Sequence, residues 1–109
     1  MKYSENLVKK TMKAINNHPE PFFNVHKRSQ CDDLGFCEIR FENLDGVQMS
    51  FNICGDEVNA IVYTDKSGNG YKWLGSCCLS KINSDSYMMW LGIKLSKMYE
   101  YADNCIECE

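Results

Sequence analysis

The strongest constraint on the fold is an alternation of apolar and polar residues through 36–54, interrupted once by Asn43-Leu44-Asp45-Gly46. A hydrophobic period of two places the apolar side chains on one face of an extended strand. A short segment with glycine between two such runs is typical of a β-hairpin turn. The sequence therefore predicts an antiparallel hairpin with one apolar face, which another part of the chain must cover.

Helices are predicted on both sides of this hairpin along the chain. In 4–17, apolar residues recur three and four positions apart with lysines opposite, and Pro19 ends the segment. A second helix is predicted from Ser84, as its N-cap, to about 101–103. Its apolar side is formed by Met88, Leu91, Leu95, Met98 and Ala102.

Further extended segments accompany the hairpin. Residues 58–64 are rich in β-branched and aromatic residues and are predicted to form a strand. A further strand is predicted at 71–79, after a polar loop, and 22–27 is a short extended segment. The predicted fold class is α+β, a small antiparallel meander sheet of three or four strands flanked by an N-terminal and a C-terminal helix. The economical arrangement packs both helices on the apolar face. Residues 1–109 are expected to form a single domain, because two separate cores would each be too small.

The chain has seven cysteines in 109 residues. They are interpreted as metal ligands, as catalytic thiols or as small buried side chains. The first residues of the chain lack the apolar stretch of a signal peptide, so we expect a cytoplasmic protein with reduced thiols. Cys105 and Cys108 have the spacing of half a zinc site, which needs two further ligands. Cys31, Cys37 and His26 are the candidates, and zinc is the cofactor that this alternative implies.

Three other cysteines lie in or beside predicted strands. Cys54, Cys77 and Cys78 are expected to behave as small hydrophobic side chains, and at most one of the adjacent pair can point inward. A thiol enzyme stays an alternative, using either Cys31, for example with His26, or one of the tail cysteines, because such partners meet in space rather than in sequence. The sequence contains no local catalytic signature, so we expect a non-enzymatic protein.

Charge indicates the kind of partner. The net charge is −3, and residues 31–109 carry six basic and thirteen acidic residues. An acidic surface repels a phosphate backbone and attracts a basic protein surface, so we expect a protein partner and no direct nucleic acid. The acidic candidates for partner binding lie on the polar face of the predicted strands and at their turns. They are Glu38, Glu42, Asp45, Asp56 and Glu57.

Aromatic residues gather in the second half of the chain. Tyr71, Trp73 and Trp90 are further candidates for partner binding, because tyrosine and tryptophan are common interface anchors. In the second helix, several residues fall roughly opposite the apolar side, which fits either a deeply buried helix or an interface. These residues are Tyr87, Trp90, Lys94, Lys97 and Tyr101.

The segment 33–41, DLGFCEIRF, together with Asp45-Gly46-Val47, resembles the class I secretion chaperones. That resemblance implies a homodimer that holds an extended segment of an effector protein. The further helix and strands that those chaperones place before their closing helix are not evident here. In size and acidic balance the chain is also similar to small phage inhibitors, the anti-CRISPR proteins among them.

These observations favour a small acidic protein-binding module, an inhibitor or adaptor. It would occupy a basic surface of a partner, such as one that binds nucleic acid, as phage anti-defence proteins do. A structural domain held together by zinc and a dimeric protein similar to the secretion chaperones are the alternatives. No apolar run is long enough to span a membrane, and either a monomer or a homodimer fits the sequence.

Overall fold

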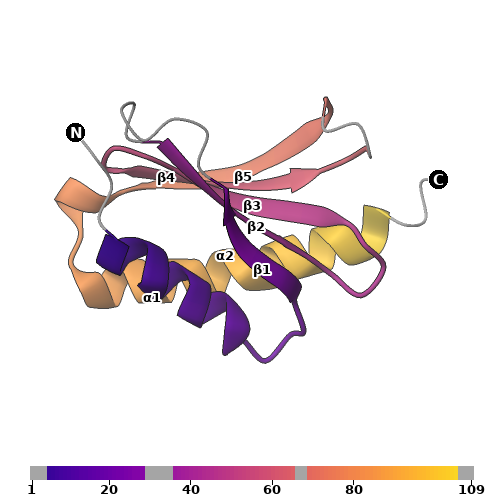
Figure 1. Cartoon of the computed structure of the whole chain (residues 1–109), viewed down its shortest axis with the longest axis horizontal. Coiled ribbons are helices and arrows are strands. Elements are labelled where there is room, and N and C mark those ends of the chain that lie inside the picture. Colours follow the sequence, from indigo (N-terminus) through magenta and orange to yellow (C-terminus); the bar gives the residue numbers. More distant parts are fainter. Residues whose placement is uncertain (1–4, 29–35, 66–68, 106–109) are drawn as a thin grey trace.

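The computed structural model describes residues 5–28, 36–65 and 69–105. Two helices flank a five-stranded antiparallel meander in the order β1-β2-β3-β4-β5, with a short 3-10 helix, η2, before the last helix (Figure 1). The elements are α1 (Glu5–Asn16), β1 (Phe23–Arg28), β2 (Phe36–Glu42), β3 (Gln48–Cys54), β4 (Glu57–Tyr63), β5 (Tyr71–Cys78), η2 (Leu79–Lys81) and α2 (Ser84–Cys105). The predicted α+β fold is therefore confirmed, with five strands rather than three or four.

The additional strand is β1, which the sequence indicated only as a short extended segment. It pairs antiparallel with β2 at the edge of the sheet, with an irregularity between Phe23 and His26. Asn24 has a φ of 54° within this irregularity, a left-handed conformation that asparagine tolerates better than most residues. Because most of β1 is exposed, it lacks the hydrophobic alternation that identifies a half-buried strand.

The predicted hairpin is formed by β2 and β3, which pair from Phe36↔Cys54 to Glu42↔Gln48. Asn43 organises the turn, because its Oδ1 accepts hydrogen bonds from the backbone N–H groups of Asp45 at 3.0 Å and Val47 at 2.9 Å. Gly46 has a φ of 83°, a conformation that favours glycine. Local turn chemistry therefore sets the register of the two central strands.

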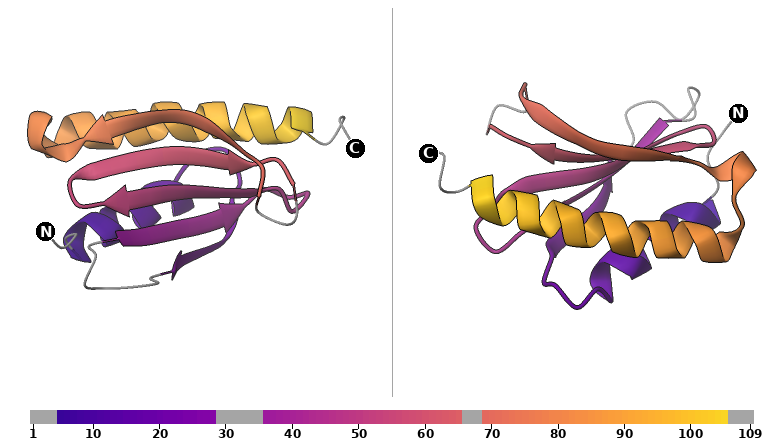
Figure 2. Two further views of the ribbon diagram at one scale, coloured as in Figure 1. Left: turned by 90° about the horizontal axis from the view of Figure 1, so that it is seen from above. Right: turned by 180° about the vertical axis from the view of Figure 1, so that it is seen from behind.

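Both helices lie on the same side of the sheet (Figures 1 and 2). Helix α1 contacts β1 and β2, whereas α2 contacts β4 and β5, so together they cover one face. The core lies between this face and the helices. Its fully buried larger side chains include Ile15, Ile39, Phe41, Met49, Phe51, Ile53, Leu91, Leu95 and Met98.

Tyr87 belongs to this core, although the sequence placed it opposite the apolar side of the second helix. That prediction is wrong, because Tyr87 is buried one helical turn before Leu91 and lies on the same side of α2. The Thr11 hydroxyl donates to the Leu7 carbonyl at 2.8 Å, and the Tyr87 hydroxyl lies 2.7 Å from Thr11 Oγ1. This bond joins the two helices, and burial raises the pKa of Tyr87 well above its usual range.

Helix α2 begins differently from the prediction. Asn83, rather than Ser84, is the capping residue, because Asn83 Oδ1 accepts a hydrogen bond from the Ser86 backbone N–H at 2.8 Å. The Ser84 hydroxyl instead accepts a hydrogen bond from the Lys10 ammonium at 2.8 Å. Among the residues described, no helix has the length and hydropathy to cross a bilayer.

Candidate functional site

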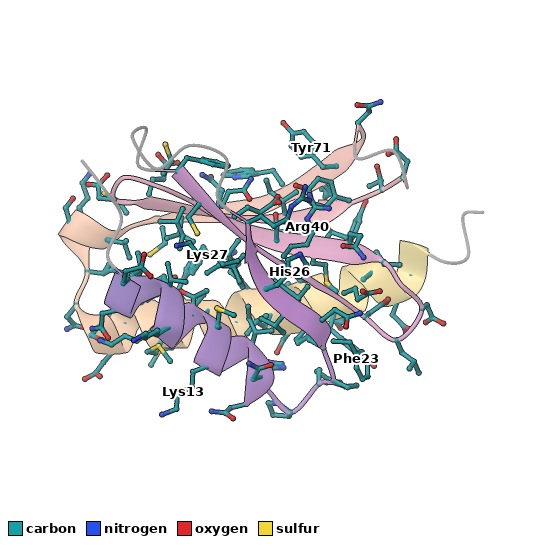
Figure 3. The ribbon with its side chains drawn as sticks, in the orientation of Figure 1. Lys13, Phe23, His26, Lys27, Arg40 and Tyr71 are labelled. Atoms are coloured by element: carbon teal, nitrogen blue, oxygen red, sulfur yellow. The ribbon has the colours of Figure 1, made fainter. Side chains whose placement is uncertain are left out.

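The second face of the sheet carries no helix. Side chains alternate along each strand, so Arg40 points away from the helices while Ile39 and Phe41 point toward them. Figure 3 shows Arg40 and Tyr71 on the side of the sheet that faces away from both helices. Because polar side chains predicted to bind a partner lie here, this uncovered face is the candidate functional site.

Glu38 was predicted to belong to an acidic face that binds a partner. Its carboxylate instead accepts hydrogen bonds from the Arg40 guanidinium at 3.1 Å and from the Tyr63 hydroxyl at 2.6 Å, and it ion-pairs with Arg28 at 3.7 Å. Only 8% of the residue is exposed. The structure therefore gives Glu38 an internal pairing role that the sequence analysis did not predict.

The other predicted acids do not form one continuous patch. Glu42 is partly buried, and its Oε1 accepts a hydrogen bond from Asn24 Nδ2 at 2.6 Å. Asp45 is exposed in the turn before β3, whereas Asp56 and Glu57 are exposed after it. Because β3 has seven residues, these two groups are separated by roughly 20 Å. The acidic charge therefore lies at two ends of the sheet, with a paired arginine–glutamate cluster between them.

Tyr63 completes this central cluster. The Arg40 guanidinium lies 4.3 Å from the centre of the Tyr63 ring, a cation–π arrangement. Burial, followed by the hydrogen bond to Glu38, raises the pKa of Tyr63 above its ordinary value. Ser50, opposite Arg40 on β3, is fully buried even though no helix covers this face. The cluster is thus packed and internally hydrogen-bonded, and it gives the centre of the uncovered face a fixed shape.

Tyr71 and Trp73 lie beside this cluster, on the edge strand β5. Tyr71 is 60% exposed and Trp73 is 53% exposed, yet the indole N–H of Trp73 donates to Asn59 Oδ1 at 3.0 Å. In the strand register Tyr71 lies opposite Tyr63, and Trp73 lies opposite Ile61. We call Ile61, Tyr63, Tyr71 and Trp73 the aromatic surface. Tyr71 and Trp73 give this surface its exposed apolar area, and hydrogen bonds hold the side chains of Tyr63 and Trp73.

Trp90 does not join this surface. It is partly buried on the helix-covered side, with its ring centre 5.9 Å from that of Phe51 and 6.1 Å from that of Tyr87. The structure thus divides the predicted aromatic candidates between the two sides of the sheet. Of the three predicted aromatic candidates, Tyr71 and Trp73 are exposed on the uncovered face.

The predicted zinc ligands are also divided. Cys37 is fully buried on the helix-covered face, while His26 pairs with Arg40 on the uncovered face, so these two residues cannot bind the same ion. Cys105 is the last residue of α2, and Cys31 and Cys108 lie outside the described residues. Within the described ranges there is no group of three or more potential metal ligands. Zinc binding by the remaining cysteines stays a prediction.

The other cysteines differ in exposure. Cys77 is buried, and desolvation raises the pKa of its thiol above the ordinary value. Cys54 is exposed, and Cys78 is partly exposed with its Sγ 3.2 Å from Ser80 Oγ. One member of the adjacent pair therefore points into the core, as expected, whereas Cys54 does not act as a core side chain.

No protein family, no curated protein and no solved structure matches this chain. The candidate site therefore rests on the geometry of the chain itself. Part of that geometry has a signal in the sequence, since Glu38 and Arg40 are two positions apart on one strand and must share a face. Arg28 and Tyr63 have no such signal, because only the pairing of β1 with β2, and of β3 with both β2 and β4, brings them to Glu38.

Proposed function

We propose that this chain is a non-enzymatic protein-binding module, an inhibitor or adaptor, that docks a partner protein on the uncovered face of its sheet. The observation that carries the proposal is the exposure of Tyr71 and Trp73 on an ordered face. Large contiguous patches of exposed apolar surface are uncommon in monomeric proteins and mark interaction sites. Tyrosine and tryptophan are also the residues that most often anchor such interfaces.

The order of the uncovered face supports this role. Trp73 is held by Asn59, and Arg40 is held by both Glu38 and Tyr63. Side chains that are already fixed lose less conformational entropy when a partner binds. Trp73 of the aromatic surface and the neighbouring Arg40 are therefore held in place before a partner binds.

The charge of the chain favours a partner with a basic surface, such as a surface that binds nucleic acid. Asp56 and Glu57 are exposed where β3 turns into β4, at one end of the sheet, and the net charge is −3. Exposed charges at the rim of an interface mainly accelerate association and select the partner. The proposal also places the protein in the cytoplasm, where the thiols of Cys54 and Cys78 would stay reduced.

The experiment compares two double variants as bait for affinity capture from the source cells. Y71A/W73A removes the exposed aromatic side chains, while the control M89A/I93A removes two side chains of α2 that are 69% and 50% exposed. A partner captured by wild type and by the control is then purified, and its affinity for all three proteins is measured. We expect Y71A/W73A to weaken binding by at least about 100-fold, as the loss of two interface anchors would.

Equal affinity of the purified partner for wild type and Y71A/W73A would contradict the proposal. Loss of binding in M89A/I93A alone would move the interface to α2. Circular dichroism of each variant before the assay separates lost binding from lost folding.

A further inference from the structure

We propose that a pocket at the end of the molecule where both helices begin binds a small carboxylate with an apolar body. The pocket has a volume of about 340 Å³, within the usual range for ligand sites. It is bounded by the start of α1, the turn between β3 and β4, and the segment that leads from β5 into α2. These walls differ from the aromatic surface, so the inference does not depend on the proposed function.

The walls of the pocket are largely apolar. Leu7 contributes from α1, Leu79 and Ile82 contribute from the segment before α2, and Tyr87 contributes from the first turns of α2. The hydroxyl of Tyr87 is engaged with Thr11 between the helices, so Tyr87 offers its ring rather than a further polar group. A ligand with a short aliphatic or aromatic body would bury apolar area against these side chains.

Lys10 supplies the charge that selects a carboxylate. Its ammonium donates to the Ser84 hydroxyl at 2.8 Å, at the first residue of α2. Within the part of the chain described, Lys10 ion-pairs with no carboxylate. A cation beside the positive end of a helix is unfavourably placed. A carboxylate bound in the pocket would compensate this charge and accept a charge-assisted hydrogen bond from Lys10.

Asp56 is the opposing charge at the pocket. It is exposed in the turn between β3 and β4, and its Oδ2 lies 3.7 Å from the thiol of Cys78. A carboxylate ligand would be repelled by Asp56, whereas an amine would be attracted. The proposal assigns recognition of the ligand to Lys10, so the carboxylate should bind in preference to the amine, and comparing these two probes tests that assignment.

The experiment titrates the full chain with 3-phenylpropanoate, its neutral amide and 3-phenylpropylamine, and follows backbone NMR signals. We expect saturable shifts around Lys10 and Ser84 with a dissociation constant below about 1 mM for the carboxylate, which lies within the affinity range of ligands of this size. The amide should bind at least about 10-fold more weakly, because it lacks the charged acceptor.

Variants test the assigned roles. K10Q should weaken binding of the carboxylate by about 10-fold or more, while the neighbouring exposed lysine variant K9Q should leave it unchanged. D56N should tighten binding or leave it unchanged. The inference is overturned by equal binding of acid and amide, by preferred binding of the amine, or by an unchanged affinity in K10Q. It is also overturned if D56N abolishes binding or if no probe gives saturable shifts below about 10 mM.

Discussion

The two faces of the sheet are built on different principles. The helix-covered face is a continuous apolar layer in which Ile39, Phe41 and Phe51 are fully buried. At the centre of the uncovered face the buried groups include a charged one, Glu38, which is paired with Arg40 and Tyr63. The helix-covered face therefore contributes most of the free energy of unfolding. The uncovered face contributes less, and its paired side chains form a surface of defined shape.

The largest loss of stability should follow from a substitution that leaves a cavity in the helix-covered face. Phe51→Ala removes a fully buried ring between the sheet and α2, which should lower the free energy of unfolding by about 3–5 kcal/mol. Phe23→Ala, at a partly exposed position on the edge strand, should lower it by less than about 1 kcal/mol. Urea denaturation of both variants measures the difference. Similar losses in the two would contradict the division between a stabilising face and an exposed edge.

A smaller effect is expected at the centre of the uncovered face. Glu38→Gln keeps the shape of the side chain but leaves Arg40 and Tyr63 without their charged acceptor, which should cost about 1–3 kcal/mol. The matched change Glu42→Gln alters a single partly exposed hydrogen bond and should cost less than about 0.5 kcal/mol. The two variants are compared by thermal unfolding at neutral pH. If both have the same melting temperature, the cluster around Glu38 does not stabilise the protein.

Removing the hydrogen bond between the two helices should lower the free energy of unfolding by about 1 kcal/mol at neutral pH. Tyr87→Phe removes the hydrogen bond to Thr11 but keeps the buried ring. Because the pKa of Tyr87 is raised in the folded protein, folding favours its protonated form, and the wild type should lose stability as the pH rises above the ordinary tyrosine value of about 10. Tyr87→Phe should lose less stability over the same interval. Identical alkaline unfolding curves for the two proteins would exclude this contribution.

The smallest effect on stability is expected on the aromatic surface. Trp73→Ala removes a side chain of a residue that is more than half exposed, so the free energy of unfolding should change by only about 0.5 kcal/mol. Guanidinium titration of Trp73→Ala against wild type checks this value. A loss above about 2 kcal/mol would make Trp73 a structural residue and weaken its assignment as a binding anchor.

The same contrast explains how far the sequence could be interpreted. The hairpin of β2 and β3 was predictable, because one apolar face produces an alternation that persists through both strands. Strand β1 is mostly exposed and pairs only at the edge, so no comparable pattern marks it. Tyr87 was misplaced because α2 carries aromatic residues around much of its circumference, and its contact with Thr11 on α1 selects the buried side.

The candidate site was less predictable than the fold. Exposed tyrosine and tryptophan on β5 were identified, but the acidic residues were expected to act together. The strand register separates Asp45 from Asp56, and it places Arg28 of the edge strand β1 opposite Glu38. Whether Glu38 is paired with an arginine depends on which strands are neighbours in the sheet. The composition of the chain does not contain that information.

The most direct test of the account follows the two tryptophan indole N–H signals by NMR during titration with the purified partner. The chain has two tryptophans, and the structure places Trp73 on the uncovered face and Trp90 on the helix-covered side. We expect the Trp73 signal to shift or broaden on binding while the Trp90 signal stays in place. A shift of Trp90 with an unchanged Trp73 would contradict the assignment of the uncovered face as the binding surface.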